Sequence, residues 1–270
     1  MILKDKVAVI YGAGGGIGGA IARAFASEGA AVFLTGRRLA PVEVVAKDIV
    51  SAGGSAEAAE VDAIDEQAVD RHLQSVIASA GHVDISFNAV GTPYAYGDEH
   101  NAPILGVPLT DLAAGQFSLP VATLLTSYFL TARLAARHMI VNRSGVIMTA
   151  TAVHSRVGFP LVGGYGPAQA AKEALTRDLS AELAPHGIRV VGLRPYAIPE
   201  TPLIKDAFHQ RAHELGVTWE QWQEVLASTT HPQRLMTLEE TTSMAVFLAS
   251  DRASGMTGTT VNLTMGRVDD

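Results

Sequence analysis

The feature that most constrains this chain is a regular alternation of short apolar runs with longer segments of helical periodicity. The runs rich in β-branched residues, which predict strands, are Val7–Tyr11, Ala31–Thr35, Ala58–Val61, Val83–Phe87, Gly145–Thr149, Ile188–Leu193 and Thr260–Leu263. The segments with helical spacing are Ile17–Glu28, Leu39–Ala52, Glu66–Ala80, Val121–Met139, Pro167–Pro185 and Glu239–Ala249. This alternation predicts an α/β fold with a mainly seven-stranded parallel sheet and helices on both faces.

The whole chain, residues 1–270, is predicted to form a single domain. No stretch reads as a linker, no segment repeats at a fixed period, and 48% of the residues are apolar. A net charge of −7 without a basic stripe argues against nucleic acid as a partner. The lack of cysteine excludes disulfides and thiolate-bound metals and fits a cytoplasmic protein. We expect no signal peptide and no apolar stretch that spans a membrane.

A glycine-rich turn follows the first predicted strand and opens the first predicted helix. It reads Gly12-Ala13-Gly14-Gly15-Gly16-Ile17-Gly18. Such a turn lets the backbone approach a pyrophosphate, whose charge the free N–H groups at the helix start can hold. The alternative is a plain tight turn, but the position between strand and helix favours a phosphate site. Because ligands bind beyond the carboxyl ends of parallel strands, functional residues are expected directly after the strands.

The spacing of Gly12, Gly16 and Gly18 resembles that of the short-chain dehydrogenase/reductase superfamily, whose fold is the Rossmann-type doubly wound sheet. Other segments between residues 4 and 266 resemble its motifs, namely Asp62, Asn88-Ala89-Val90-Gly91, Tyr165, Ala184–Val190, Arg194-Pro195, Thr201 and Thr257-Gly258. The resemblance implies a dinucleotide site. Its residues would be Gly12, Gly14, Gly15, Gly16, Ile17, Gly18, Asp62, Ala63, Asn88, Ala89, Gly91, Pro195, Ile198 and Thr201.

The end of the second predicted strand bears on which dinucleotide binds. It reads Leu34-Thr35-Gly36-Arg37-Arg38 and contains no acidic residue. In NAD-binding folds an acidic residue accepts hydrogen bonds from the ribose diol at this place, whereas an arginine can pair with a 2′-phosphate. The alternative is that Arg37 and Arg38 are solvated charges at a helix start. The sequence therefore predicts NADP(H) as the cofactor.

The catalytic set implied by the resemblance is incomplete. In the family a tyrosine exchanges a proton with the substrate oxygen, a serine orients that oxygen, and a lysine lowers the tyrosine pKa. Tyr165 lies at the tyrosine position, although a packing role is the alternative. The serine position, thirteen residues earlier, holds Ala152, and the lysine position, four residues later, holds Gln169. The resemblance thus implies an atypical member in which the usual serine and lysine are replaced.

Two nearby side chains could substitute for the missing ones. Thr151 has a hydroxyl that could donate to a substrate oxygen, unless it points into the packing on the other side of the strand. Lys172 follows Tyr165 with the Tyr-x6-Lys spacing of enoyl reductases in this superfamily. On a helix it would lie about 10.5 Å along the axis and about 20° in rotation from Tyr165, so it could reach back. The alternative for Lys172 is an ordinary surface lysine.

Substrate contacts are expected from two regions. Ala152 and His154 follow the fifth predicted strand, and His154 is either a general acid near neutral pH or a solvated loop histidine. The resemblance makes residues 199–232 a small helical lid, whose apolar side chains pack onto the body or line a pocket. The aromatic candidates of this region are Tyr196, Trp219 and Trp222. Tyr94, Tyr96 and His100 border the same cleft or lie on the surface.

Together these features predict an NADP(H)-dependent oxidoreductase that reduces a carbonyl, imine or activated alkene of an apolar or aromatic small molecule. Tyr165 is the predicted proton donor, because a phenol with no cation beside it stays protonated at neutral pH. Two alternatives remain open: a cofactor-binding protein without redox turnover, with a regulatory or structural role, and a redox-neutral lyase or cyclase. The family resemblance also implies a homo-oligomer, a dimer or tetramer.

Overall fold

In the computed structural model, which describes residues 1–91, 105–202, 205, 209, 212–213 and 216–269, seven strands form one parallel sheet. They are β1 Val7–Tyr11, β2 Ala31–Gly36, β3 Ser55–Glu60, β4 Ile85–Asn88, β5 Gly145–Ala150, β6 Ile188–Pro195 and β7 Thr259–Leu263. Their order is β3-β2-β1-β4-β5-β6-β7. The chain winds outward from β1 to β3, returns to β4 and winds outward to β7, which confirms the predicted doubly wound fold.

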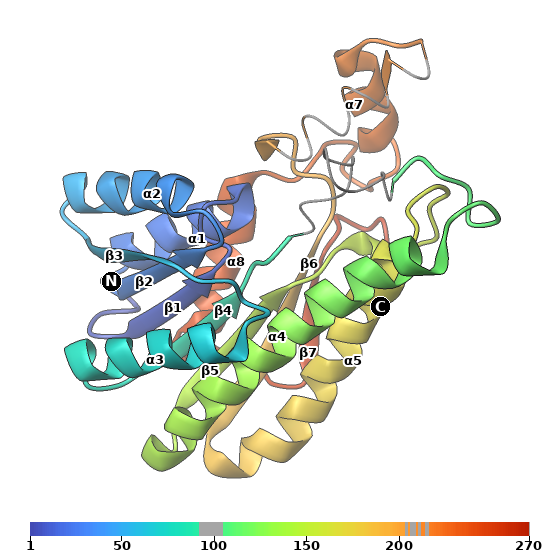
Figure 1. The fold of residues 1–270 in the computed structure, drawn as a ribbon. Coiled ribbons are helices and arrows are strands. Elements are labelled where there is room, and N and C mark those ends of the chain that lie inside the picture. Colours follow the sequence, from blue (N-terminus) through green and yellow to red (C-terminus); the bar gives the residue numbers. More distant parts are fainter. Residues whose placement is uncertain (92–104, 203–204, 206–208, 210–211, 214–215, 270) are drawn as a thin grey trace.

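Helices cover both faces of the sheet (Figure 1). One face carries α1 Gly16–Ser27, α2 Leu39–Ser51 and α8 Leu238–Ala249. The other carries α3 Glu66–Ala80, α4 Ala114–Asn142 and α5 Tyr165–Leu183. Short 3-10 turns follow β5, α5 and α8 at Val153–Ser155, Ala184–His186 and Asp251–Ala253.

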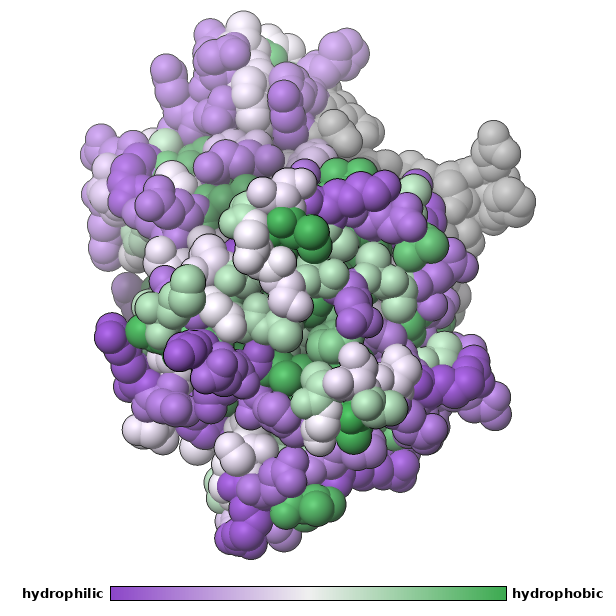
Figure 2. Space-filling model, turned by 90° about the vertical axis from the view of Figure 1, so that its left-hand side faces the viewer, coloured by the Kyte–Doolittle hydropathy of each residue, from purple (hydrophilic) through white to green (hydrophobic). Residues whose placement is uncertain are grey.

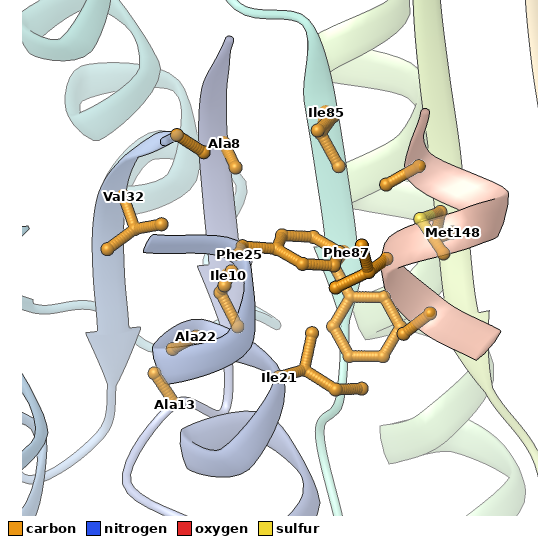
Figure 3. Packing of buried hydrophobic residues seen from close by; sticks show 14 of the residues in the cluster. Ala8, Ile10, Ala13, Ile21, Ala22, Phe25, Val32, Ile85, Phe87 and Met148 are labelled. Atoms are coloured by element: carbon orange, nitrogen blue, oxygen red, sulfur yellow. The ribbon is translucent and has the colours of Figure 1, made fainter. Parts of the chain in front are cut away.

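The two-faced burial is visible in β1, where all five residues are buried. Val7, Val9 and Tyr11 point to the layer of α3, α4 and α5, whereas Ala8 and Ile10 point to the layer of α1 and α8. This alternation follows from the two-residue repeat of a strand, and a continuous apolar run is what a parallel strand covered on both faces requires. Figure 3 shows Ile10 among Ile21, Phe25 and Phe87 on the face covered by α1 and α8.

Helix α4 differs from its prediction at the N-terminus. It begins at Ala114, seven residues before the expected Val121, and Pro120 lies inside it. The φ of proline suits a helix and proline removes only one donor, so a helix that is packed on both sides can run through it. Tyr165 likewise begins α5, two residues before the expected Pro167. Tyr165 is therefore held in the first turn of a helix.

The expectation that no apolar stretch could span a membrane needs correction for α4. The helix has 29 residues and a mean hydropathy of 1.3 in its most apolar window, which suffices by length and composition. However, 56% of that window is buried, with α3 and α5 packed on either side. The apolar character of α4 is therefore accounted for by its place in the core of the domain.

The predicted lid region is described in part and contains α7 Trp219–Ala227, which stands away from the sheet at one end of the molecule (Figure 1). Helix α7 starts with a capping box in which Thr218 accepts from the backbone of Gln221. Figure 2 shows hydrophilic side chains over this uppermost part of the molecule. Two of its apolar side chains, Trp222 and the buried Leu226, belong instead to a cluster with the body. Of the predicted loop 92–111, only residues 105–111 are described, and they hold no helix or strand.

Candidate active site

The glycine-rich loop lies at the point where the sheet order reverses, between β1 and β4. Gly12 has a φ of +79°, and a Cβ there would come within 2.6 Å of the Ala89 carbonyl oxygen. Gly12 thus needs to be glycine for two reasons, its backbone conformation and the close approach of the segment after β4. This contact brings together two of the predicted cofactor-binding segments at the crevice where doubly wound folds bind nucleotides.

The residues of this loop fit the pyrophosphate of a dinucleotide. The N-cap residue of helix α1 is Gly15, so no side chain caps the helix. No acidic residue lies in the first turn of α1. Gly14 and Gly15 are exposed, whereas Gly18 is buried against the loop itself. The first N–H groups of α1 are therefore not capped by a side chain, and the positive end of the helix dipole faces the loop without a competing carboxylate.

The other predicted cofactor contacts lie around the same edge. A Cβ on Gly16 would come within 2.9 Å of the Thr201 side chain, so the segment after β6 reaches the phosphate loop. Arg37 and Arg38 are exposed at the end of β2, where Arg38 is the N-cap of α2. Asp62 accepts a hydrogen bond of 3.2 Å from the backbone of Ile64. Ala63, Pro195 and Ile198 are buried and Gly91 is exposed.

Among the described residues, the buried polar atoms without a hydrogen-bond partner include Asn88 Oδ1 and Gln169 Oε1 near the crevice. Helix α4 holds the Asn88 side chain in place, because Asn88 Nδ2 donates to Thr131 Oγ1 over 3.2 Å. Both side chains are at least 96% buried. An unpaired buried acceptor costs free energy unless a ligand donates to it. Such acceptors suit the hydroxyl groups of a ribose.

Tyr165 is positioned by the residue before it. A Cβ on Gly164 would lie 2.0 Å from the carbonyl oxygen of Phe117, so glycine lets the first turns of α4 approach the start of α5. Burial raises the pKa of the Tyr165 phenol above its ordinary value, and an interaction with Gln169, one helical turn later, counters part of this rise. The phenol is therefore protonated at neutral pH.

A buried ionic cluster around Glu173 lies two helical turns after Tyr165 on the same face of α5, and the sequence did not predict it. Glu173 accepts from Arg194 Nε and Nη2 over 2.8 and 2.9 Å, and also from Ser155 and Thr151 over 2.5 and 3.1 Å. Burial alone would raise the pKa of Glu173, but these donors hold it below its usual range. The spacing of Tyr165, Gln169 and Glu173, each four residues apart, places them on one face of a helix and could have indicated that Glu173 lies near the site.

Thr151 is packed inside the protein, the alternative to donating to a substrate oxygen. Its hydroxyl lies 3.1 Å from Glu173 Oε1 and 3.2 Å from the Leu193 carbonyl oxygen, and the side chain is buried. A hydroxyl has a single hydrogen to donate, and both acceptors of Thr151 belong to the protein. Ala152 follows it and is partly exposed.

Lys172 is not a surface lysine, so that alternative is wrong. Its side chain is 1% exposed, and its Nζ donates to the Ala150 carbonyl oxygen over 2.6 Å, at the end of β5. The ammonium also lies 5.8 Å from the centre of the Tyr128 ring. Burial lowers the pKa of Lys172 to about 7. The side chain leans toward the start of its helix, which brings the ammonium to the carboxyl end of β5 instead of into solvent.

His154 is partly buried and packs against two aromatic rings. Its ring lies edge-on to Tyr165, with ring centres 5.1 Å apart, and 4.5 Å from the centre of the Phe159 ring. Burial lowers the pKa of His154 to about 4, so the imidazole is neutral at pH 7 and holds no acidic proton to transfer. Its Nδ1 is buried and has no partner among the described residues.

The substrate-side candidates form a small apolar cluster between lid and body. It contains Val153, Tyr196, Ala197 and Leu226, with Trp222 and Phe159 packed against it. The Tyr196 hydroxyl lies 3.2 Å from Thr229 Oγ1, and Trp219 stacks on His209 instead of joining the cluster. Tyr94, Tyr96 and His100 lie outside the described residues.

A cavity of about 420 Å³ lies at the opposite edge of the sheet, by the amino ends of the strands. The charged groups on its wall already have partners in the protein. Lys6 pairs with Asp251 over 3.6 Å, and Arg189 donates to the carbonyl oxygens of Leu248 and Ser250. None of the predicted site residues lines it. The candidate active site is therefore the carboxyl edge.

The chain matches the family described as Enoyl-(Acyl carrier protein) reductase over residues 12–267. It is 33% identical over 256 residues to the uncharacterized oxidoreductase YxbG of Bacillus subtilis (strain 168), covering 95% of this chain and 88% of YxbG. NAD⁺-bound xylitol dehydrogenase has a TM-score of 0.88 at 24% identity, covering 99% of this chain and 100% of that one. A variant of actinorhodin polyketide ketoreductase with NADPH has a TM-score of 0.87 at 23% identity, covering 97% of each chain.

The fold and these matches define an oxidoreductase on a Rossmann-type scaffold, the class to which YxbG is assigned. The chain belongs to the short-chain dehydrogenase/reductase superfamily, in the family described as Enoyl-(Acyl carrier protein) reductase. This superfamily uses nicotinamide cofactors, and the two structural neighbours carry NAD⁺ in one case and NADPH in the other.

Proposed function

We propose that the protein is an NADP(H)-dependent reductase of a carbonyl, imine or activated alkene in an apolar or aromatic small molecule. The observation that carries this proposal is the state of Tyr165, whose pKa is raised by burial, with Gln169 rather than a lysine one turn later. A phenol that stays protonated can give a proton to a substrate oxygen, but it is a poor base for oxidising an alcohol. The site therefore favours reduction.

The cofactor would be held by residues around the crevice. The Gly12–Gly18 loop and the start of α1 suit the pyrophosphate, Arg37 and Arg38 a 2′-phosphate, and Asn88 and Gln169 the hydroxyls of a ribose. Bound NADPH supplies the hydride for the reaction.

In the proposed reaction Tyr165 donates its proton to the substrate oxygen while the substrate carbon accepts the hydride, and the phenolate regains a proton from solvent. The apolar cluster around Tyr196 and Trp222 supports an apolar or aromatic substrate. In this proposal Ala152 and Gln169 occupy the family's serine and lysine positions, so neither supplies the groups that usually assist the tyrosine.

We expect Tyr165→Phe to slow the reduction step by about 10²–10⁴-fold while NADPH still binds, because the variant lacks the proton donor but keeps the ring. The measurement is single-turnover loss of the absorbance of enzyme-bound NADPH against ketones, quinones, imines and enones. Tight NADPH binding without decay on this panel would favour a cofactor-binding protein without turnover. Conversion that ignores the nicotinamide redox state would favour a lyase or cyclase.

The cofactor preference is tested separately. We expect Arg37→Ala to weaken NADPH binding by about 10–100-fold, the cost of a lost charged hydrogen bond, and to leave NADH binding unchanged. Arg38→Ala, which removes the other arginine assigned to the 2′-phosphate, is titrated in parallel and should also weaken NADPH binding. Titration of each variant by quenching of tryptophan fluorescence gives both dissociation constants. A wild-type protein that binds NADH at least as tightly as NADPH would overturn this part of the proposal.

We further propose a cytoplasmic homo-oligomer, a dimer or tetramer, that takes small molecules and contacts neither nucleic acid nor membrane. The absence of cysteine and the net charge of −7 support the location and the lack of nucleic acid. Helices α4 and α5 pack side by side, and three large apolar side chains of α4, Phe117, Phe129 and Val141, remain exposed, which supports a contact with a second subunit.

A further inference from the structure

The hydroxyl groups closest to Ala152 in the chain are already engaged with Glu173. Ser155 lies 2.5 Å from Glu173 Oε1 and Thr151 lies 3.1 Å from the same oxygen. Glu173 is ionised, since its donors hold its pKa below the usual range, and a carboxylate can only accept. Both hydroxyl hydrogens are therefore directed at the protein, and neither side chain is free to donate to a substrate oxygen as a catalytic serine would.

Besides Gln169, a second polar side chain lies against the proton donor. The imidazole of His154 meets Tyr165 edge-on, with an angle of 80° between the rings and 5.1 Å between their centres. The two rings are therefore in direct contact, so the imidazole is a neighbour of the proton donor. The ring of Phe159 also packs against the imidazole, with 4.5 Å between the ring centres.

The imidazole also has hydrogen-bonding capacity that the protein does not use. Nδ1 of His154 is buried and has no partner among the described residues. With its pKa lowered by burial to about 4, the ring is neutral at pH 7 and carries one N–H and one acceptor nitrogen. A neutral imidazole can polarise a carbonyl by donating this N–H, and it does so without transferring the proton.

We propose that His154 is a catalytic residue that donates a hydrogen bond to the substrate oxygen next to Tyr165, in place of a serine hydroxyl. This inference rests on the proposed reductase function and deepens it. In the reaction the proton is transferred from Tyr165, while the N–H of His154 stabilises the negative charge that develops on the oxygen. No proton or electron is gained or lost by the imidazole.

Two variants separate donation from packing. His154→Phe keeps an aromatic ring against Phe159 but has no N–H, whereas His154→Gln keeps an amide donor and loses the ring. We expect His154→Phe to slow single-turnover reduction by about 100-fold with an unchanged dissociation constant for NADPH. His154→Gln should recover part of this rate. Thermal unfolding of each variant reports whether the fold is retained.

An unchanged reduction rate in His154→Phe would overturn the inference and leave the proposed reductase function intact. The same holds if His154→Gln is as slow as His154→Phe while both remain folded, because the donor would then be irrelevant. A wild-type protein that oxidises no bound NADPH on the whole substrate panel would overturn the proposed function and this inference with it.

Discussion

Arg194→Met is expected to lower the free energy of unfolding by about 3–5 kcal/mol, the cost of leaving a buried charge without its partner. Arg194 is 2% exposed and Glu173 is 4% exposed, and they share two hydrogen bonds of 2.8 and 2.9 Å. Without Arg194, Glu173 keeps the hydroxyls of Ser155 and Thr151 and a longer contact of 3.6 Å with the exposed Arg156, but it loses the buried cation that compensates its desolvation. Urea unfolding followed by circular dichroism measures the change.

The double variant Arg194→Met, Glu173→Met serves as the control. Replacing both members of a buried pair by apolar groups of similar volume is often close to neutral, so the double variant should be more stable than Arg194→Met alone. Equal losses in the single and double variants would mean that the pair does not compensate its own desolvation. The pair joins α5 to the end of β6 and to the turn after β5, so it also determines how these segments meet beside Tyr165.

Lys172→Met is expected to remove a pH dependence of stability. The pKa of Lys172 is lowered to about 7 in the folded protein, whereas a lysine in the unfolded chain has a pKa of about 10.4. Between these values the unfolded chain binds more protons than the folded protein, so wild-type stability rises with pH. From pH 7 to pH 9 the wild type should gain about 2 kcal/mol relative to the variant, at about 1.4 kcal/mol per unit.

Comparing wild type and Lys172→Met at each pH cancels the titration of all other groups. The measurement is a series of urea unfolding curves at pH 7, 8 and 9. A constant difference across the series would show that Lys172 has an ordinary pKa and that its ammonium is solvated. Methionine is chosen because it preserves the length of the stem that packs near Tyr128.

Much of the fold follows from periodicity alone. Val7–Tyr11 and Glu66–Ala80 were predicted with their observed bounds, because β1 is buried on both faces and α3 has an acidic residue at its start and glycine after its end. Other boundaries differed, among them that of β3, which is Ser55–Glu60 instead of Ala58–Val61, and the start of α4. Helix α4 runs through Pro120 because its neighbours α3 and α5 bury it on both sides, which no local rule at the proline indicates.

The sequence by itself determined the order of strands and helices, the glycine loop and the position of Tyr165, because these depend on residues that are neighbours along the chain. The tertiary structure alone decided which polar groups are paired. Glu173 meets Arg194, twenty-one positions away, Lys172 donates to the Ala150 carbonyl oxygen, and the rings of His154 and Tyr165, eleven positions apart, are in contact. Burial and pairing between distant segments set the pKa of each group and the direction of each donor, and a linear pattern carries neither.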